Sequence, residues 1–182
     1  MVNGWEQTVL QQTNPLHRQF FQNAWVVDDV EASIHRWSTE LGIGPFFVTE
    51  YRNLFSDVRY HGQPAELEMI VALAQNGPMQ IELIQPLVDQ CAYRDSVTHG
   101  TGFHHMCVWS DSVPDDIAYF ANLGYPAANS ASVGPVDFAY FDTRSMLGCM
   151  LEVVTKNPNT EARFAEIAAA GANWDGMNPI RR

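Results

Sequence analysis

Two stretches of the chain repeat one pattern of hydrophobic and polar positions. Residues 22–30 (QNAWVVDDV) and 105–113 (HMCVWSDSV) align without gaps. Each opens with β-branched and aromatic residues, which favour a strand, and then reaches an Asp or Ser of the kind that caps a helix N-terminus. Apolar residues follow at helical spacing, at positions 30, 34, 37 and 41 and again at 113, 117 and 120, and glycines at 42 and 124 stand where each helix should end. The pattern predicts a strand–helix unit that occurs twice.

The later part of each half supports the repeat. Residues 79–86 (MQIELIQP) and 150–156 (MLEVVTK) both predict a short strand with a glutamate at its centre. Further runs typical of strands lie between helix and final strand, at residues 46–51, 66–73 and 138–142. Each half is therefore predicted to be β-α-β-β-β, and neither half alone has enough apolar residues for an independent core. We predict an α+β fold in which two βαβββ modules pack as one domain with a concave face.

The domain boundaries follow from where the repeat begins and ends. The domain is predicted to span residues 17–157, with modules at about 17–90 and 100–157. Residues 1–16 are polar and rich in Gln and Asn, as in an N-terminal arm. Residues 158–182 predict one short helix, capped near Thr160 and burying Phe164 and Ile167, followed by an irregular tail. No chemistry is expected at either end.

Composition and charge restrict the partners of the chain. Its 182 residues, 46% hydrophobic and 17% charged, have the balance of a globular protein. A formal net charge of -11 is repelled by phosphate, so neither nucleic acid nor an anionic membrane is an expected partner. Three cysteines without CxxC spacing indicate a reducing compartment. Without a visible secretory signal or an apolar stretch of about 20 residues, we expect a cytoplasmic protein.

Polar side chains occupy one face of several predicted strands. Because side chains alternate along a strand, Glu82 points away from the apolar face of its strand, and Glu152 does the same in the second half. Gln22 belongs to the opening strand. Matching the halves places His105 on the face of Gln22, whereas its neighbour His104 should point to the helix side or to solvent.

These four side chains could converge on one point of the concave face. Gln22, Glu82, His105 and Glu152 offer an amide oxygen, two carboxylates and an imidazole, a set that suits Zn²⁺, Ni²⁺, Co²⁺, Mn²⁺ or Fe²⁺. A cation would relieve the cost of burying two carboxylates together. A single strand glutamate is more often solvated, and a His-His pair more often structural. The matched positions in both halves therefore carry the prediction of a divalent metal site.

Five segments give the chain a family resemblance. They are residues 26–32 (VVDDVEA), 41–46 (LGIGPF), 81–86 (IELIQP), 102–106 (GFHHM) and 148–154 (GCMLEVV). Over roughly residues 18–157 the chain resembles the vicinal oxygen chelate superfamily, the glyoxalase/bleomycin-resistance/dioxygenase fold, and especially its methylmalonyl-CoA epimerase-like and glyoxalase members. The resemblance implies a metal-centred cup. In this family the second histidine of the pair is the ligand, which agrees with His105.

One ligand position departs from the epimerase-like pattern. Those members normally begin with a histidine ligand, and here that position is Gln22. Eukaryotic glyoxalase I is similar to this chain, with Gln, Glu, His and Glu ligands in that order. Extradiol dioxygenases use two histidines and a glutamate around Fe²⁺, so that chemistry is disfavoured. Bleomycin-resistance-type members bind ligands without metal, which leaves a metal-free small-molecule binding or sequestration protein as the alternative.

The resemblance implies a reaction class. It indicates a metal-dependent lyase or isomerase that moves a proton alpha to a carbonyl or thioester of a small molecule through a metal-stabilised enolate. Glu82 and Glu152 are candidate bases, and Glu66 or Glu68 on the preceding strand are the alternatives. The resemblance also implies a homodimer.

Three residues are candidates to line the substrate pocket. Cys107 and Trp109 share the predicted face of His105, and Tyr140 lies on a strand near the cup.

Overall fold

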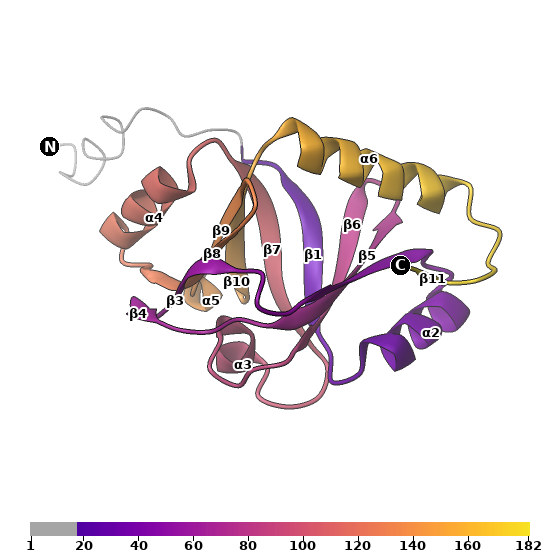
Figure 1. The fold of residues 1–182 in the computed structure, drawn as a ribbon, viewed down its shortest axis with the longest axis horizontal. Helices are drawn as coiled ribbons and strands as arrows, with labels where there is room; N and C mark the ends of the chain where they lie inside the picture. The colour runs from indigo at the N-terminus through magenta and orange to yellow at the C-terminus, as the bar shows by residue number, and fades with distance from the viewer. Residues whose placement is uncertain (1–17) are drawn as a thin grey trace, which may run out of the picture.

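The computed structural model describes residues 18–182, and all eleven strands in this range form one mixed sheet around a concave face (Figure 1). The first module places its strands in the order β2-β5-β6-β1 and the second in the order β7-β10-β9-β8. The elements of the first module are β1 (Phe20–Val26), α2 (Val30–Leu41), β2 (Phe46–Tyr51), β5 (Met69–Asn76) and β6 (Met79–Pro86). Those of the second are β7 (Gly102–Ser110), α4 (Val113–Asn122), β8 (Ala127–Val133), β9 (Val136–Phe141) and β10 (Met150–Thr155).

The two modules are related by an approximate twofold axis between β1 and β7. These strands pair antiparallel at the centre of the sheet, and each pairs in parallel with the last strand of its own module. The predicted caps are present, since Asp29 accepts a hydrogen bond from the backbone of α2 and Ser112 from that of α4. The α+β fold with two βαβββ modules is confirmed. The boundaries of the domain stay a prediction.

Each helix packs on its own module through the predicted apolar positions. Val30 and Ile34 of α2 join a buried cluster with β5 and β6, and Val113 and Phe120 of α4 join a second cluster with β9 and β10. A third cluster lies inside the concave face. Because both helices cover the outer face, the inner face is left to form a pocket.

A hairpin from the first module extends the edge of the second. β3 (Ser56–Tyr60) pairs with β8, and β4 (Gln63–Pro64) pairs with β3. The chain between β2 and β5 therefore crosses from one half of the sheet to the other (Figure 1). The short helices α3 (Ala92–Ser96) and α5 (Arg144–Leu147) lie in the connections before β7 and β10.

The C-terminal segment is more ordered than its sequence indicates. The helix α6 (Pro158–Ala172) lies across one end of the central strands (Figure 1), and β11 (Ile180–Arg181) pairs with β2. The predicted start near Thr160 is wrong, because the side chain of Asn157 accepts hydrogen bonds from the first turn and caps the helix there. The predicted arm, residues 1–16, lies outside the described residues. Within residues 18–182, no helix has the length and apolar character to span a bilayer.

Candidate metal centre

Strand register brings the candidate ligands to one face of the central four strands. Ala24 of β1 is the Cα partner of both Glu82 on β6 and His105 on β7. Its methyl group leaves space for the two larger side chains to meet. The register is the same in both modules. Gln22 pairs with Gln80, and Glu82 lies two residues further along β6. Likewise, His105 pairs with Met150, and Glu152 lies two residues further along β10. The approximate twofold symmetry thus places the groups together.

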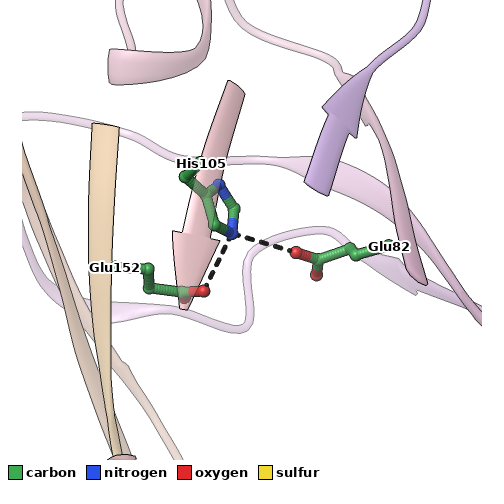
Figure 2. Close-up of side chains that lie close together, drawn as sticks. All are labelled: Glu82, His105 and Glu152. Atoms are coloured by element: carbon green, nitrogen blue, oxygen red, sulfur yellow. Dashed lines mark ion pairs between the residues drawn. The ribbon is translucent and has the colours of Figure 1, made fainter. Parts of the chain in front are cut away.

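Three of the four predicted ligands share one coordination-sized space (Figure 2). His105 Nε2 lies 3.0 Å from Glu152 Oε2 and 3.3 Å from Glu82 Oε2. Candidate ligand atoms of the three residues all lie within 4.8 Å of one another. Among the residues described, His105 Nε2 and Glu82 Oε2 have no partner at hydrogen-bond geometry although both are buried. Two unpartnered buried atoms beside a second carboxylate fit a divalent cation.

Gln22 lies in the wall of the same pocket as Glu82 and Glu152. Its side chain is buried, and its Nε2 donates a hydrogen bond of 2.7 Å to Gln80 Oε1. Because this bond engages the amide nitrogen, the carbonyl oxygen is the atom left to act as a ligand. Its role as a metal ligand stays a prediction.

Burial and like charge set the electrostatics of the centre. Burial raises the pKa of Glu82, and the nearby Glu152 adds to this effect. Burial alone would lower the pKa of His105, but Glu152 and Glu82 together outweigh it and raise that pKa to about 9. In the absence of a cation, a proton on His105 therefore neutralises part of the carboxylate charge. A cation and that proton compete for the same nitrogen lone pair.

His104 points into the fold, so the prediction that it turns outward is wrong. Between two paired positions β1 advances by one residue, Ala24 to Trp25, while β7 advances by two, from His105 to Phe103. His104 is the extra residue of this bulge, which breaks the alternation of side chains. The side chain is fully buried, with Nδ1 only 2.8 Å from Nδ1 of His105.

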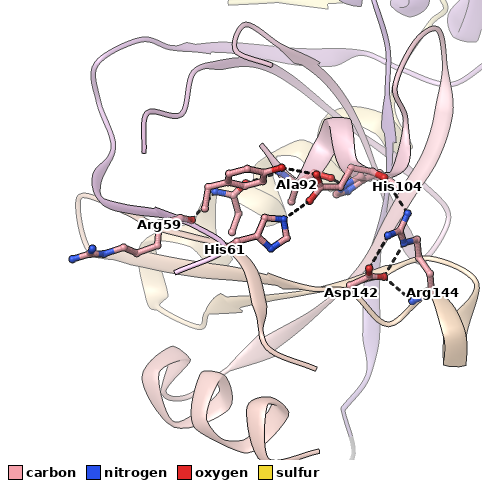
Figure 3. A network of polar contacts seen from close by, with 9 residues as sticks. Arg59, His61, Ala92, His104, Asp142 and Arg144 are labelled. Carbon is pink, nitrogen blue, oxygen red and sulfur yellow. Dashed lines mark hydrogen bonds and ion pairs between the residues drawn. The ribbon is translucent and has the colours of Figure 1, made fainter. Parts of the chain in front are cut away.

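The bulged histidine determines which nitrogen of His105 is available. His104 Nε2 lies 3.1 Å from the carbonyl oxygen of Ala92 (Figure 3), which can only accept, so this nitrogen carries the hydrogen. Burial and His105 lower the pKa of His104 to about 3, so its Nδ1 is unprotonated and accepts from His105 Nδ1. A neutral His105 then directs its Nε2 lone pair into the space between the two glutamates, where it could bind a cation. Such outer contacts orient metal ligands.

Backbone anchoring holds this histidine pair in place. The amide of Ala92, the first residue of α3, donates to Asn129 Oδ1 at 2.6 Å. Asn129 Nδ2 in turn donates to the carbonyl oxygen of Arg59 at 2.7 Å. A continuous set of hydrogen bonds therefore links β3, β8 and α3 to the candidate centre.

The candidate centre lies at the wall of a largely apolar pocket of about 390 Å³. Strands from both modules and the helix α6 line it. The sequence pattern does not anticipate that α6 contributes polar, charged and aromatic side chains to the pocket, and the expectation that this end carries no chemistry stays untested. The lining includes Phe47, Tyr51, Phe55, Phe138, Tyr140 and, from α6, Arg163, Phe164 and Ile167.

The three predicted substrate-binding residues have different surroundings. Tyr140 lines the pocket, and its hydroxyl lies 2.8 Å from that of Tyr93. Cys107 is buried beside Glu152 in the register of β7 and β10, and burial followed by the charge of Glu152 raises the pKa of its thiol well above the ordinary value. Trp109 stacks on Phe21, with ring centroids 4.3 Å apart, and also packs against α6. Trp109 thus supports the helix above the pocket. Their roles in binding stay predictions.

The structure does not bring Glu66 and Glu68 to the pocket. Glu66 is exposed near the loop that follows β6. Glu68 accepts hydrogen bonds from the backbone of Asn53 at 3.2 Å and from Arg52 at 3.4 Å. Neither glutamate is among the residues that line the pocket, which favours Glu82 and Glu152 as the candidate bases.

Sequence reasoning missed His104 and Arg163 as members of the site. Strand alternation cannot reveal a bulge, so nothing in the pattern around His104 signals its inward turn. Arg163 could have been found, because the Asn-Pro start at 157–158 and apolar residues at 164 and 167 predict a helix with one buried side.

Comparisons with known proteins agree with the repeat and the fold. A family model described as the Glyoxalase/Bleomycin resistance protein/Dioxygenase superfamily matches residues 21–140. No curated protein matches the chain by sequence.

Several solved structures share the fold at low sequence identity. A methylmalonyl-CoA epimerase from Mycobacterium tuberculosis has 16% identity and a TM-score of 0.52, over 79% of this chain and 91% of that one. A variant of the Streptomyces coelicolor methylmalonyl-CoA epimerase, in complex with 2-nitronate-propionyl-CoA, has 15% identity and a TM-score of 0.53, over 78% and 96%. A hypothetical protein from Bacillus halodurans has 17% identity and a TM-score of 0.53, also over 78% and 96%.

Proposed function

Since the chain belongs to the glyoxalase/bleomycin resistance protein/dioxygenase superfamily, we propose that it is a metal-dependent lyase or isomerase of the glyoxalase or epimerase type. It moves a proton on the carbon next to a carbonyl or thioester group of a small molecule. The observation that carries the proposal is the buried cluster of Glu82, His105 and Glu152, with two unpartnered ligand atoms, at the wall of a largely apolar pocket.

The donor set defines which residues hold the cation. Glu82, His105 and Glu152 supply two carboxylates and an imidazole, and the amide oxygen of Gln22 is the fourth donor. These hard and borderline donors suit Zn²⁺, Ni²⁺, Co²⁺, Mn²⁺ or Fe²⁺. When bound, such a cation supplies Lewis acidity that polarises a carbonyl oxygen and acidifies the neighbouring C–H.

The two buried glutamates are the groups that carry the proton. Burial raises the pKa of Glu82, which suits a carboxyl group that must both take and return a proton. Glu152 lies across His105 from Glu82, on a strand of the other module. Two carboxylates at opposite sides of one centre can take a proton from one side of a carbon and return it at the other.

The remaining pocket residues exclude water and position the substrate. Phe55, Phe138 and Val71 give the pocket apolar walls, in which the charge of a carboxylate base is poorly solvated and therefore more reactive. The hydroxyls of Tyr93 and Tyr140 are hydrogen-bonded to each other, and the ring centroid of Tyr140 lies 5.0 Å from that of His105. This packing restricts the orientation of both ring and substrate.

Metal content and proton exchange test the proposal together. Protein purified without chelator should contain about one divalent cation per chain, and Glu82→Gln and His105→Ala should lose it. His35→Ala is the matched control, because this histidine is exposed on α2. In D₂O, the metal-loaded wild type should exchange the alpha hydrogen of small carbonyl or thioester probes by NMR. A protein that binds no cation after reloading contradicts the proposal.

A second candidate function rests on the same contacts. A protonated His105 lies 3.0 and 3.3 Å from the two glutamates and can neutralise them without a cation. The chain would then be a metal-free binding or sequestration protein. In that case Glu82→Gln and His105→Ala leave ligand affinity nearly unchanged, and added metal does not alter the thermal unfolding of the wild type.

A further inference from the structure

One cationic side chain lines the pocket on the side covered by α6. Of the described residues around this pocket, the charged ones are Glu82, Glu152 and Arg163. The two glutamates belong to the candidate metal centre, whereas Arg163 projects from a helix that follows both modules. Its charge has no part in the proposed proton transfer. This residue therefore needs another explanation.

The guanidinium group of Arg163 is held in position from two sides. Its central carbon lies 4.8 Å from the ring centroid of Phe47, itself a residue of the pocket wall. One of its nitrogens lies 3.2 Å from Glu166 on the next turn of α6, and the arginine side chain is about half exposed (49%). A cation over an aromatic ring is restrained yet keeps its in-plane donors for a ligand.

Arg163 and the glutamates of the candidate metal centre belong to the wall of one pocket. This pocket has a volume of about 390 Å³, and Tyr51 also belongs to its wall. The pKa of Tyr51 agrees with this placement, because burial and Glu82 raise it while Arg163 opposes the rise. Between the two polar ends the walls are apolar and aromatic, with Phe55, Phe138 and Phe164. A compact ligand can therefore span both ends.

The charges around Arg163 explain why an anionic group is the expected ligand of this residue. Arg163 is the one cationic side chain among the described residues that line the pocket, in a chain of net charge -11. The nearby Glu166 is 69% exposed, so water weakens its competition with a ligand anion without removing it. An anionic group on the ligand thus finds one favourable place in the pocket.

We propose that Arg163 forms an anion subsite, and that the substrate is a compact carbonyl compound with an apolar body and a carboxylate at the end remote from the metal centre. The binding of the substrate's carbonyl end at the metal centre rests on the proposed function. The binding of its carboxylate by Arg163 does not. The family model ends at residue 140, so the helix that carries Arg163 lies outside the matched region.

Two hydroxamates test the subsite on the metal-loaded protein. Benzohydroxamate offers two neighbouring oxygens to a divalent cation, and 4-carboxybenzohydroxamate adds a carboxylate at the far side of the ring. By titration calorimetry, the wild type should bind the carboxylated compound about tenfold more tightly, as one partly exposed charge-assisted contact provides. Arg163→Gln should abolish this preference and leave benzohydroxamate unchanged, and Arg163→Lys should restore part of it.

One further variant should increase the preference for the carboxylated compound, and another serves as a control. Glu166→Gln removes the competing carboxylate and should increase the preference by a few-fold. Arg36→Gln removes an exposed arginine that pairs with Glu40 on α2, away from the pocket, and should change nothing. Equal affinity of the wild type for both compounds, or an equal loss of both in Arg163→Gln, overturns the proposal.

A metal-free arm separates this proposal from the proposed function. With chelator-treated protein, 4-phenylbutyrate should bind more tightly than 4-phenylbutanol, and Arg163→Gln should remove the difference. If metal fails to strengthen the binding of either hydroxamate while the butyrate preference persists, the metal-dependent function falls and the anion subsite stands. If the butyrate preference is missing in the wild type, the anion subsite falls whatever the metal does.

Discussion

The protonation of His105 gives the metal-free protein a pH dependence whose sign follows from the site. Burial opposes the charge on the imidazole, but Glu152 and Glu82 outweigh it, so the pKa rises from its ordinary value of 6.5 to about 9. A group whose pKa is raised in the folded state stabilises the fold fully below the unfolded pKa and loses this effect as pH rises through the folded pKa. We therefore expect the free energy of unfolding to fall between pH 6.5 and 9.

The size of the effect follows from the same two values. A rise from 6.5 to about 9 corresponds to roughly 3 kcal/mol, at about 1.4 kcal/mol per pKa unit. With a urea dependence of about 2 kcal/mol per molar, the unfolding midpoint drops by roughly 1.5 M. The pKa of Glu82 is also raised, mainly by burial, so its carboxyl acts in the same direction as pH rises.

The protonation of His104 sets the lower limit of the pH range in which this effect can be measured. Burial and the charge of His105 lower the pKa of His104 to about 3, so the unfolded chain binds a proton there that the fold does not. That group removes stability as pH falls below 6.5, its ordinary pKa. Measurements above pH 6.5 therefore exclude the effect of His104. Burial also raises the pKa of the Cys107 thiol, which lowers stability as the unfolded thiol ionises, so a comparison of the wild type with His105→Gln is needed to separate the two groups.

The assay is urea unfolding of chelator-treated protein, followed by tryptophan fluorescence across this window. His105→Gln should flatten most of the pH dependence, and His35→Gln, at an exposed position of α2, should leave it unchanged. Adding a divalent cation should reverse the trend, because the cation displaces the proton and binds more tightly as pH rises. The reasoning is refuted if the wild-type midpoint stays constant or rises without metal, or if His105→Gln falls as far as the wild type.

Three other perturbations test separate parts of the account. His104→Ala removes the contact that orients His105, so metal affinity measured by competition with a chromogenic chelator should fall about 10- to 100-fold, and an unchanged affinity would contradict the role of the bulge. Ala24→Leu fills the space between Glu82 and His105, so metal binding should be lost at a cost of about 1–3 kcal/mol in urea unfolding; retained binding would show that the ligands meet elsewhere. Light scattering should give twice the chain mass, as the family resemblance implies, and a monomer at all concentrations would reject the homodimer.

The pattern of the sequence was sufficient for the parts of the fold that obey simple periodicity. The helix caps at Asp29 and Ser112 and the inward face of Glu82 and Glu152 follow from local rules, because capping and strand alternation depend on neighbouring residues alone. The internal repeat then placed both glutamates at equivalent positions. Three of the four candidate ligands could be brought together on this basis.

The features that escaped prediction depend on contacts between distant segments. The bulge at His104 arises where β7 pairs with β1, and it changes which face a side chain takes. The pairing of β3 with β8 joins the first module to the far edge of the second, and no local signal specifies that partner. The pattern at residues 157–167 predicts a helix with one buried side, but only the tertiary arrangement shows that this side faces the pocket and brings Arg163 to its wall.

Diffraction from crystals of the metal-loaded protein, collected at and below the absorption edge of the added cation, tests the central claim most directly. The account predicts one anomalous peak about 2.0–2.3 Å from His105 Nε2 and from one carboxylate oxygen each of Glu82 and Glu152, with the amide oxygen of Gln22 as a further ligand. A crystal soaked in excess cation that shows no peak there, with His105 still paired to both glutamates, would contradict it.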